Sequence, residues 1–162
     1  MPEIEIRDAV PADAGTLLQL VKDLAVFERE PDAVSATEAD FLRDGFGPER
    51  RFTARLALLD RRPAGFTLFF PNYSTWEGRA GLYLEDIFVT EWARGHGVGR
   101  KLMEDLAAIA VANGWSRFDF TVLEWNPARD FYQALGFAPR ADWLPYRMSG
   151  AALRKFAKME RS

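Results

Sequence analysis

The sequence predicts an α/β fold with a mixed, mostly antiparallel central sheet and helices on both of its faces. Segments with alternating apolar and polar residues, typical of strands, are interspersed with segments whose apolar residues recur every three to four positions, typical of helices. The expected order of elements is β-α-α-β-β-β-α-β-α-β. One strand, residues 82–89, leads through a polar turn into a glycine-rich segment that opens a helix, and the rest of the chain is organised around it.

The composition is that of a folded protein with few options for metal or redox chemistry. Hydrophobic residues make up 48% and aromatic residues 14% of the 162-residue chain, so we expect residues 1–162 to form a single domain. The absence of cysteine excludes disulfides and a cysteine nucleophile, a single histidine excludes a multi-histidine site, and we predict no bound metal. A formal net charge of -3 argues against nucleic acid or an anionic membrane as a partner. No apolar run approaches the roughly 20 residues that cross a membrane, and no signal peptide is evident, so we expect a cytoplasmic protein.

Periodicity and turn residues define the elements in the first half of the chain. Leu17, Leu20 and Leu24 lie on one face of a helix, and a capping box at residues 35–38 starts a second helix. The expected elements are a strand over residues 4–7, a helix from residue 11 to about residue 27, a helix over residues 36–44, and strands over residues 52–59 and 64–70. Residues 60–63 are expected to form a hairpin turn, and residues 72–78 a polar, aromatic loop.

The second half opens with the strand over residues 82–89. Alternation places Asp86 on the face of Leu84 and Phe88, whereas Glu85 points to the opposite face unless a bulge intervenes. The remaining expected elements are a helix over residues 100–113, a strand over residues 118–123, a helix from Asn126 to Gly136, an edge strand over residues 143–149 that contains Pro145, and a helix over residues 151–159 with Leu153 and Phe156 facing inward.

The glycine-rich turn has the composition of a phosphate-binding loop. It reads Arg94-Gly95-His96-Gly97-Val98-Gly99 and opens the next helix, whose first N–H groups and dipole attract an anion. It lacks the Lys-Ser/Thr of a nucleoside-triphosphate loop and is one residue short of the dinucleotide pattern. An ordinary tight connection between strand and helix is the alternative.

Two segments resemble the GNAT (GCN5-related N-acetyltransferase) superfamily. The Arg-x-x-Gly-x-Gly turn resembles its pyrophosphate loop, and residues 125–137, Trp-Asn-Pro-Ala-Arg-Asp-Phe-Tyr-Gln-Ala-Leu-Gly-Phe, resemble the segment after its fifth strand. Residues 44–47, 73–78, 83–89 and 124–126 are similar to the diamine (spermidine/spermine) branch and its thialysine-acetylating relatives, whereas residues 138–145 depart from that branch.

The resemblance implies an acyltransferase fold with splayed central strands, acetyl-CoA as co-substrate and a homodimer. The residues implied to contact acetyl-CoA are Ile87, Phe88, Val89, Arg94, Gly95, His96, Gly97, Val98, Gly99, Arg100, Asn126 and Arg129. The residues implied to contact the amine are Phe27, Glu28, Glu85, Asp86, Glu124 and Trp125. An N–H near Val89 would polarise the thioester carbonyl as an oxyanion hole does.

Tyr132 and Glu85 are the candidate catalytic residues. A phenol within reach of the departing sulfur can act as general acid, although Tyr132 can also be a packing residue of a short helix. Glu85 is the candidate to bind the substrate ammonium and to take its proton through water, and its alternative is a solvated carboxylate or an internal salt bridge.

The predicted function is acetyl transfer to a primary amine of a small molecule, by direct attack in a ternary complex. A diamine, a polyamine or a thialysine-like amino acid is the expected acceptor. Two alternatives stay open at this point: acetylation of a protein or peptide amine, and a non-catalytic acyl-CoA-binding sensor.

Overall fold

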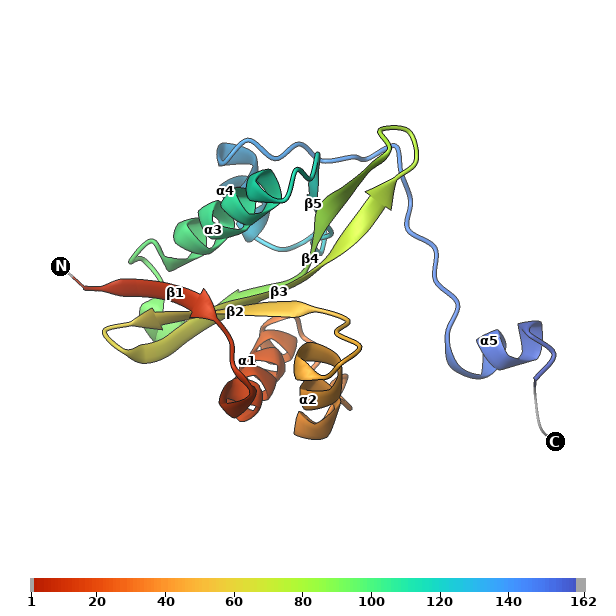
Figure 1. Cartoon of the computed structure of the whole chain (residues 1–162), viewed down its shortest axis with the longest axis horizontal. Coiled ribbons are helices and arrows are strands. Elements are labelled where there is room, and N and C mark those ends of the chain that lie inside the picture. The colour runs from red at the N-terminus through yellow and green to blue at the C-terminus, as the bar shows by residue number, and fades with distance from the viewer. Residues whose placement is uncertain (1, 160–162) are drawn as a thin grey trace. The chain divides into compact units, whose positions relative to one another are not determined.

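The computed structural model describes residues 2–159, which divide into two compact units, residues 2–123 and residues 124–159. The first unit holds one sheet and three α-helices (Figure 1). Its strands are β1 (Ile4–Asp8), β2 (Thr53–Leu59), β3 (Arg62–Ser74), β4 (Arg79–Val89) and β5 (Phe118–Phe120). Its helices are α1 (Ala14–Phe27), α2 (Glu38–Phe46) and α3 (Val98–Ala112), with short 3-10 helices η1 (Pro11–Asp13) and η2 (Glu91–Ala93). Within residues 2–159, no helix combines the length and apolar composition that crossing a membrane requires.

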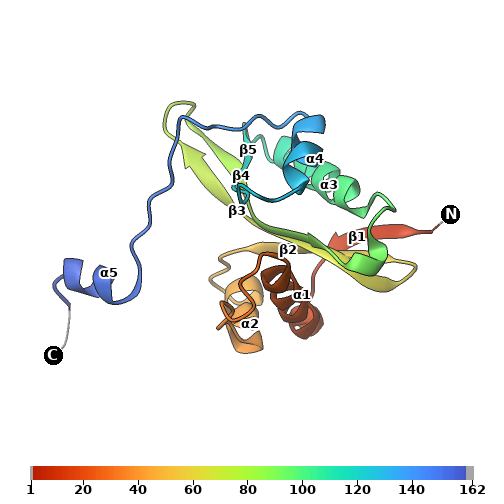
Figure 2. The same cartoon turned by 180° about the vertical axis from the view of Figure 1, so that it is seen from behind.

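The five strands form a mixed sheet in the order β1-β2-β3-β4-β5. The first four strands pair antiparallel, and β5 alone runs parallel to its neighbour β4. Helices α1 and α2 lie on one face of the sheet and α3 lies on the other (Figures 1 and 2). The predicted fold class, a mostly antiparallel sheet with helices on both faces, is therefore confirmed.

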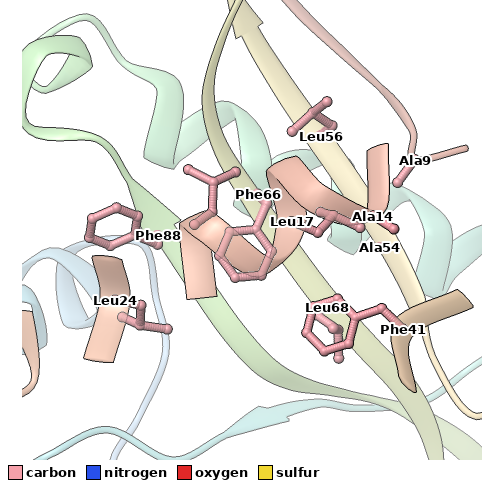
Figure 3. Packing of buried hydrophobic residues seen from close by; sticks show 11 residues of the cluster. Ala9, Ala14, Leu17, Leu24, Phe41, Ala54, Leu56, Phe66, Leu68 and Phe88 are labelled. Atoms are coloured by element: carbon pink, nitrogen blue, oxygen red, sulfur yellow. The ribbon is translucent and has the colours of Figure 1, made fainter. Parts of the chain in front are cut away.

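A core of eleven buried residues lies between the sheet and helices α1 and α2. The predicted stripe of Leu17, Leu20 and Leu24 is buried there, since leucines three and four positions apart share one side of a helix. They pack against Phe66 of β3 and Phe88 of β4 (Figure 3). This packing fixes the end of α1 beside β4, the strand that leads into the glycine-rich turn.

Helix α3 packs on the opposite face of the sheet. Its buried residues Val98 and Leu102 contact Ala57 of β2, and Ile87 and Val89 pack against the same cluster. The start of α3 is thus held directly against the last residues of β4. A buried hydrophobic residue at the first position of a helix orients the turn that precedes it.

Two hairpins differ from the sequence expectation. The turn between β2 and β3 consists only of Asp60 and Arg61, whose φ angles are +49° and +68°, so that Leu59 pairs directly with Arg62. Strand β3 also continues to Ser74, and only a short turn connects it to Arg79, the first residue of β4. The expectation of a loop over residues 72–78 is therefore wrong. Cross-strand pairing with β4 holds the polar residues at its end in extended conformation.

The capping box of α2 also differs from the expected one. Thr37 Oγ1 accepts from Asp40 N at 3.2 Å, and Asp40 Oδ2 accepts from Thr37 N at 2.8 Å. The helix therefore begins at Glu38, not at residue 36. The same type of motif is used two residues later than the sequence suggested.

The second unit contains two short helices, α4 (Ala128–Ala134) and α5 (Gly150–Phe156). The expected strand over residues 143–149 is wrong, because these residues form no ladder in the described chain. A strand needs a hydrogen-bonded neighbour, and Pro145 cannot donate to one. The expectation that Leu153 and Phe156 face inward is also wrong, since they are 51% and 77% exposed.

Candidate functional site

A β-bulge at Glu85 sets the geometry of β4. Phe69 pairs with Leu84 and the preceding residue, Leu68, pairs with Asp86, so that Glu85 is an extra residue without a partner on β3. An extra residue reverses the alternation of the strand that carries it. The expectation that Leu84, Asp86 and Phe88 share one face is therefore wrong.

The pairing shows which face each side of the bulge presents. Phe66 and Leu68 both belong to the core under α1 and α2, and Phe69 must face the other way because it follows Leu68 directly. Leu84, opposite Phe69, therefore faces α3. Asp86, opposite Leu68, faces α1 and α2, the face on which Phe88 packs.

At this point of the first unit, the charges of two carboxylates, Glu85 and Glu28, act on a third, Asp86. Burial, followed by the negative charges of Glu85 and Glu28, raises the pKa of Asp86 from its ordinary value of 3.8 to about 6. Glu28 directly follows the end of α1, and burial raises its pKa as well. Glu85 itself is exposed. The bulge and the end of α1 thus bring Glu28, Glu85 and Asp86 together, an arrangement that favours a bound cation.

The edge of β4 is partly released from the sheet after the bulge. Strand β5 pairs with β4 over Leu82–Leu84, and no further β4–β5 pair forms in the described residues. Residues 85–89 continue as β4 along its other neighbour, β3. The predicted splaying of the central strands corresponds to this point, where main-chain groups on one edge of β4 leave the ladder.

Gly65 of β3 permits the close approach of β3 to the end of β4. A Cβ at this position would lie 2.5 Å from the Phe88 carbonyl oxygen and 3.3 Å from Val89 Cα. The next turn is fastened to the same strand, because Thr90 N and Thr90 Oγ1 both donate to the Ala64 carbonyl, at 2.8 and 3.1 Å. Gly65 is not among the residues predicted from the sequence, although an isolated glycine within a strand pattern is a signal of close backbone approach.

The glycine-rich turn has the conformation that an anion-binding loop requires. Gly95 and Gly97 have φ angles of +81° and +83°, and a Cβ on either would meet no atom within 4 Å. Glycine is therefore needed for the backbone and not for packing, and the space beside it is open. Lys101 N donates to the Gly97 carbonyl at 3.1 Å, so the N–H groups of residues 98–100 have no acceptor within their own helix.

The side chains of the turn fold back onto the protein. Arg94 Nε donates to the Val89 carbonyl at 3.1 Å, and its guanidinium lies 5.2 Å from the centre of the Phe27 ring and 5.7 Å from that of Phe88. His96 Nδ1 lies 3.2 Å from the Ala93 carbonyl and 3.1 Å from that of Arg94. Because both neighbours are acceptors, we assign the proton of a neutral His96 ring to Nδ1. His96 stabilises the turn itself.

Other predicted residues belong to the second unit. Asn126 Oδ1 accepts from the N–H of Ala128, the first residue of α4, at 2.9 Å, although the cap position itself is held by Pro127. Arg129 Nη1 donates to the Glu124 carbonyl at 2.8 Å, which fastens the exposed Glu124–Trp125 segment to the same helix. Tyr132 is partly buried, with its ring 5.5 Å from that of Phe131. The roles predicted for these residues in catalysis and binding stay predictions.

The described residues contain no metal site. Within the described part of the chain, no group of three or more histidines, aspartates and glutamates is arranged to hold a metal ion.

A strand that separates from its neighbour, a glycine turn open to an anion and a helix start behind it define an acyltransferase class of protein, and the comparisons agree. The sequence profile described as "Acetyltransferase (GNAT) family" matches residues 17–137. The chain belongs to this family and is an N-acetyltransferase.

Its relatives place it in the diamine and thialysine branch of the family. It is similar to the thialysine N-epsilon-acetyltransferase of Bos taurus, at 35% identity over 97% of this chain and 99% of that protein. It is also similar to the spermidine/spermine N(1)-acetyltransferase-like protein 1 of Homo sapiens, at 33% identity over 97% of this chain and 24% of that protein. Among solved structures, an integron cassette protein of V. cholerae has a TM-score of 0.81 and 27% identity, covering 96% of this chain and 98% of its own.

Proposed function

We propose that the protein transfers an acetyl group from acetyl-CoA to a primary amine of a small molecule, a di- or polyamine or a thialysine-like amino acid. The observation that carries the proposal is the bulge at Glu85, which together with the end of α1 groups Glu85, Asp86 and Glu28 in the unit that also holds the glycine turn. The group of carboxylates suits a compact cation, and the glycine turn suits the phosphates of a co-substrate. The relatives named for thialysine and for spermidine and spermine support an acceptor of this chemistry.

The residues of the turn fit the diphosphate of acetyl-CoA. The N–H groups of residues 98–100 at the start of α3 are available to an anion, and the left-handed conformation of Gly95 and Gly97 leaves their backbone uncovered. The backbone of residues 87–89 lies where β4 has left its ladder with β5, so its main-chain groups can pair with an extended ligand arm. When bound, acetyl-CoA supplies an acetyl thioester that a neutral amine can attack, with release of a thiolate.

The carboxylates bind the amine and remove its proton. Glu85 is exposed and draws in the ammonium group, whose proton leaves through water to Glu85 or to its neighbour Asp86. Since burial and the charges of Glu85 and Glu28 raise the pKa of Asp86 to about 6, this carboxylate is a stronger base than an ordinary aspartate near neutral pH. The amine nitrogen then forms the new C–N bond while the C–S bond breaks, and the Val89 N–H stabilises the negative charge on the carbonyl oxygen.

The proton for the departing thiolate comes from Tyr132. Its hydroxyl can donate to the sulfur, and the proton that the amine nitrogen loses as the amide forms restores the phenol, while the earlier proton, taken from the ammonium at the carboxylates, leaves to solvent. Asn126 and Arg129 are assigned to the binding of acetyl-CoA, and Glu124 and Trp125 to the binding of the acceptor. The family to which the chain belongs supports these assignments.

A homodimer in the cytoplasm completes the proposal. Seven large apolar side chains near the C-terminal end are exposed, and a second copy of the chain would cover such a surface. They are Trp143, Leu144, Tyr146, Met148, Leu153, Phe156 and Met159. Sedimentation equilibrium tests this: a monomer at micromolar concentration would contradict it.

A turnover screen tests the proposed function. We expect acetyl-CoA consumption with at least one acceptor among putrescine, spermidine, spermine and thialysine, and much less with lysine-containing peptides. Mass spectrometry of the product identifies the acetylated nitrogen. Turnover confined to peptides would favour a protein acetyltransferase, and acetyl-CoA binding without turnover on any amine would favour a sensor.

A further inference from the structure

Arg94 touches two parts of the molecule that the proposed function assigns to different ligands. On one side, its Nε donates to the carbonyl of Val89, the last residue of β4, at 3.1 Å. On the other side, its guanidinium lies 5.2 Å from the ring centre of Phe27, the last residue of α1 and the neighbour of Glu28. The ring of Phe88, at 5.7 Å, is a further contact of the guanidinium.

These contacts use properties that only arginine has. A planar guanidinium can stack on aromatic rings with its faces while an N–H in its plane donates to a carbonyl, which a lysine ammonium cannot do in the same geometry. Distances of 5.2 and 5.7 Å lie within the range of about 6 Å over which a cation is attracted to an aromatic ring. Phe88 lies in the same core cluster as Leu24, so the Phe88 ring that Arg94 contacts is held in place (Figure 3).

We propose that Arg94 is a positioning residue that couples the acetyl-CoA turn to the acceptor end of α1. Through Val89 it orients the end of the strand to which the thioester binds, and through Phe27 it orients the aromatic and acidic residues that receive the amine. Binding at the turn and binding at the end of α1 therefore favour each other. This inference rests on the proposed function and adds to it a specific link between the two halves of the site.

A role confined to the diphosphate makes a different prediction. If Arg94 supplied only positive charge, a lysine would serve nearly as well, and the effect of replacing it would not depend on the ring at position 27. If Arg94 acts through Phe27, the effect of losing the guanidinium depends on whether that ring is present. A double-mutant cycle measures this dependence directly.

The cycle combines Arg94→Lys with Phe27→Leu in the full chain. We expect Arg94→Lys to raise the KM for thialysine roughly two- to fivefold, the size of an exposed cation–π contact. In the Phe27→Leu background, the same replacement should raise KM much less. Arg62→Lys is the matched control: the Arg62 guanidinium lies 4.2 Å from the ring centre of Trp92, a cation–π contact that does not involve Phe27, and its effect should multiply with that of Phe27→Leu.

A second measurement does not depend on the acceptor. Glu28 N and Glu30 N donate to carbonyls at the end of α1, those of Leu24 and Ala25, so their hydrogen exchange reports on the order of this segment. Coenzyme A should slow exchange over residues 26–30 at least twofold in the wild type and less in Arg94→Lys.

Independent effects of Arg94→Lys and Phe27→Leu on KM would overturn the inference, as would equal slowing, or no slowing, of exchange in wild type and variant. These outcomes differ from those expected if the proposed function itself is wrong. In that case calorimetry finds no binding of acetyl-CoA to the wild-type protein, or the wild type turns over no amine.

Discussion

Replacing Asp86 with asparagine should make the protein more stable while making it a poorer enzyme. The carboxylate of Asp86 is partly buried on the α1 face of the sheet, close enough to Glu85 and Glu28 to be affected by their charges. Its ionised form is therefore disfavoured in the folded protein compared with the unfolded chain. An amide of the same size removes this cost and also removes the base that the proposed reaction uses.

The size of the gain follows from the pKa of Asp86. Because the folded-state pKa is raised from 3.8 to about 6, the folded protein binds more protons than the unfolded chain between these values, and its stability falls as pH rises through this window. A difference of about 2 units corresponds to about 3 kcal/mol at most. Since solvent reaches part of the carboxylate, we expect Asp86→Asn to add about 1–3 kcal/mol above pH 6, and about a third of its full gain at pH 4.5.

Urea unfolding of the wild type and Asp86→Asn at pH 4.5, 5.5, 6.5 and 7.5 measures this gain. Asp13→Asn is a control of opposite sign, because the hydrogen bond from Arg7, at 2.7 Å, lowers the pKa of the Asp13 carboxyl. The stabilisation by Asp13 is present above pH 3.8 and is lost as pH falls below it, so Asp13→Asn should destabilise the protein at pH 7.5. A gain for Asp86→Asn that is the same at all four pH values, or no gain at pH 7.5, would refute the reasoning.

Three further predictions concern the acid, the turn and the exposed carboxylate. Tyr132→Phe should lower kcat by roughly ten- to a thousandfold with acetyl-CoA affinity nearly intact, and a near-wild-type kcat would leave Tyr132 as a packing residue. Gly97→Val should raise the Kd of acetyl-CoA at least tenfold in calorimetry. Gly114→Val is the control, because it places the same backbone strain (φ +71°) at the other end of α3 and should lower stability without changing the Kd of acetyl-CoA. Equal Kd values of acetyl-CoA for the two variants would contradict the assignment of the turn to the diphosphate. Glu85→Gln should lower kcat/KM for amines by about ten- to a hundredfold, a loss that shrinks as assay pH approaches the amine pKa; a loss independent of pH would make Glu85 an anchor only.

Local patterns in the sequence were sufficient for the buried face of α1 and for the turn. Leu17, Leu20 and Leu24 predicted the buried face of α1 correctly, because helix geometry places such residues together whatever the helix packs against. Gly95 and Gly97 predicted an open turn at the start of a helix, since the left-handed conformation that they adopt is inexpensive for glycine alone. The family resemblance of the turn and of residues 125–137 is borne out by the family to which the chain belongs.

Strand properties depended on partners that lie elsewhere in the chain. The bulge at Glu85 exists because β3 pairs with β4 in one particular register, and the alternation of residues 82–89 taken alone predicted the wrong face for Asp86. The segment over residues 143–149 alternates like a strand, but without a neighbouring strand it forms none. The electrostatic effect of Glu28 on Asp86 likewise arises only when α1 packs onto the sheet. Helix periodicity is a property of a segment, whereas strand register and the pKa of a carboxylate are set by what the folded chain places beside them.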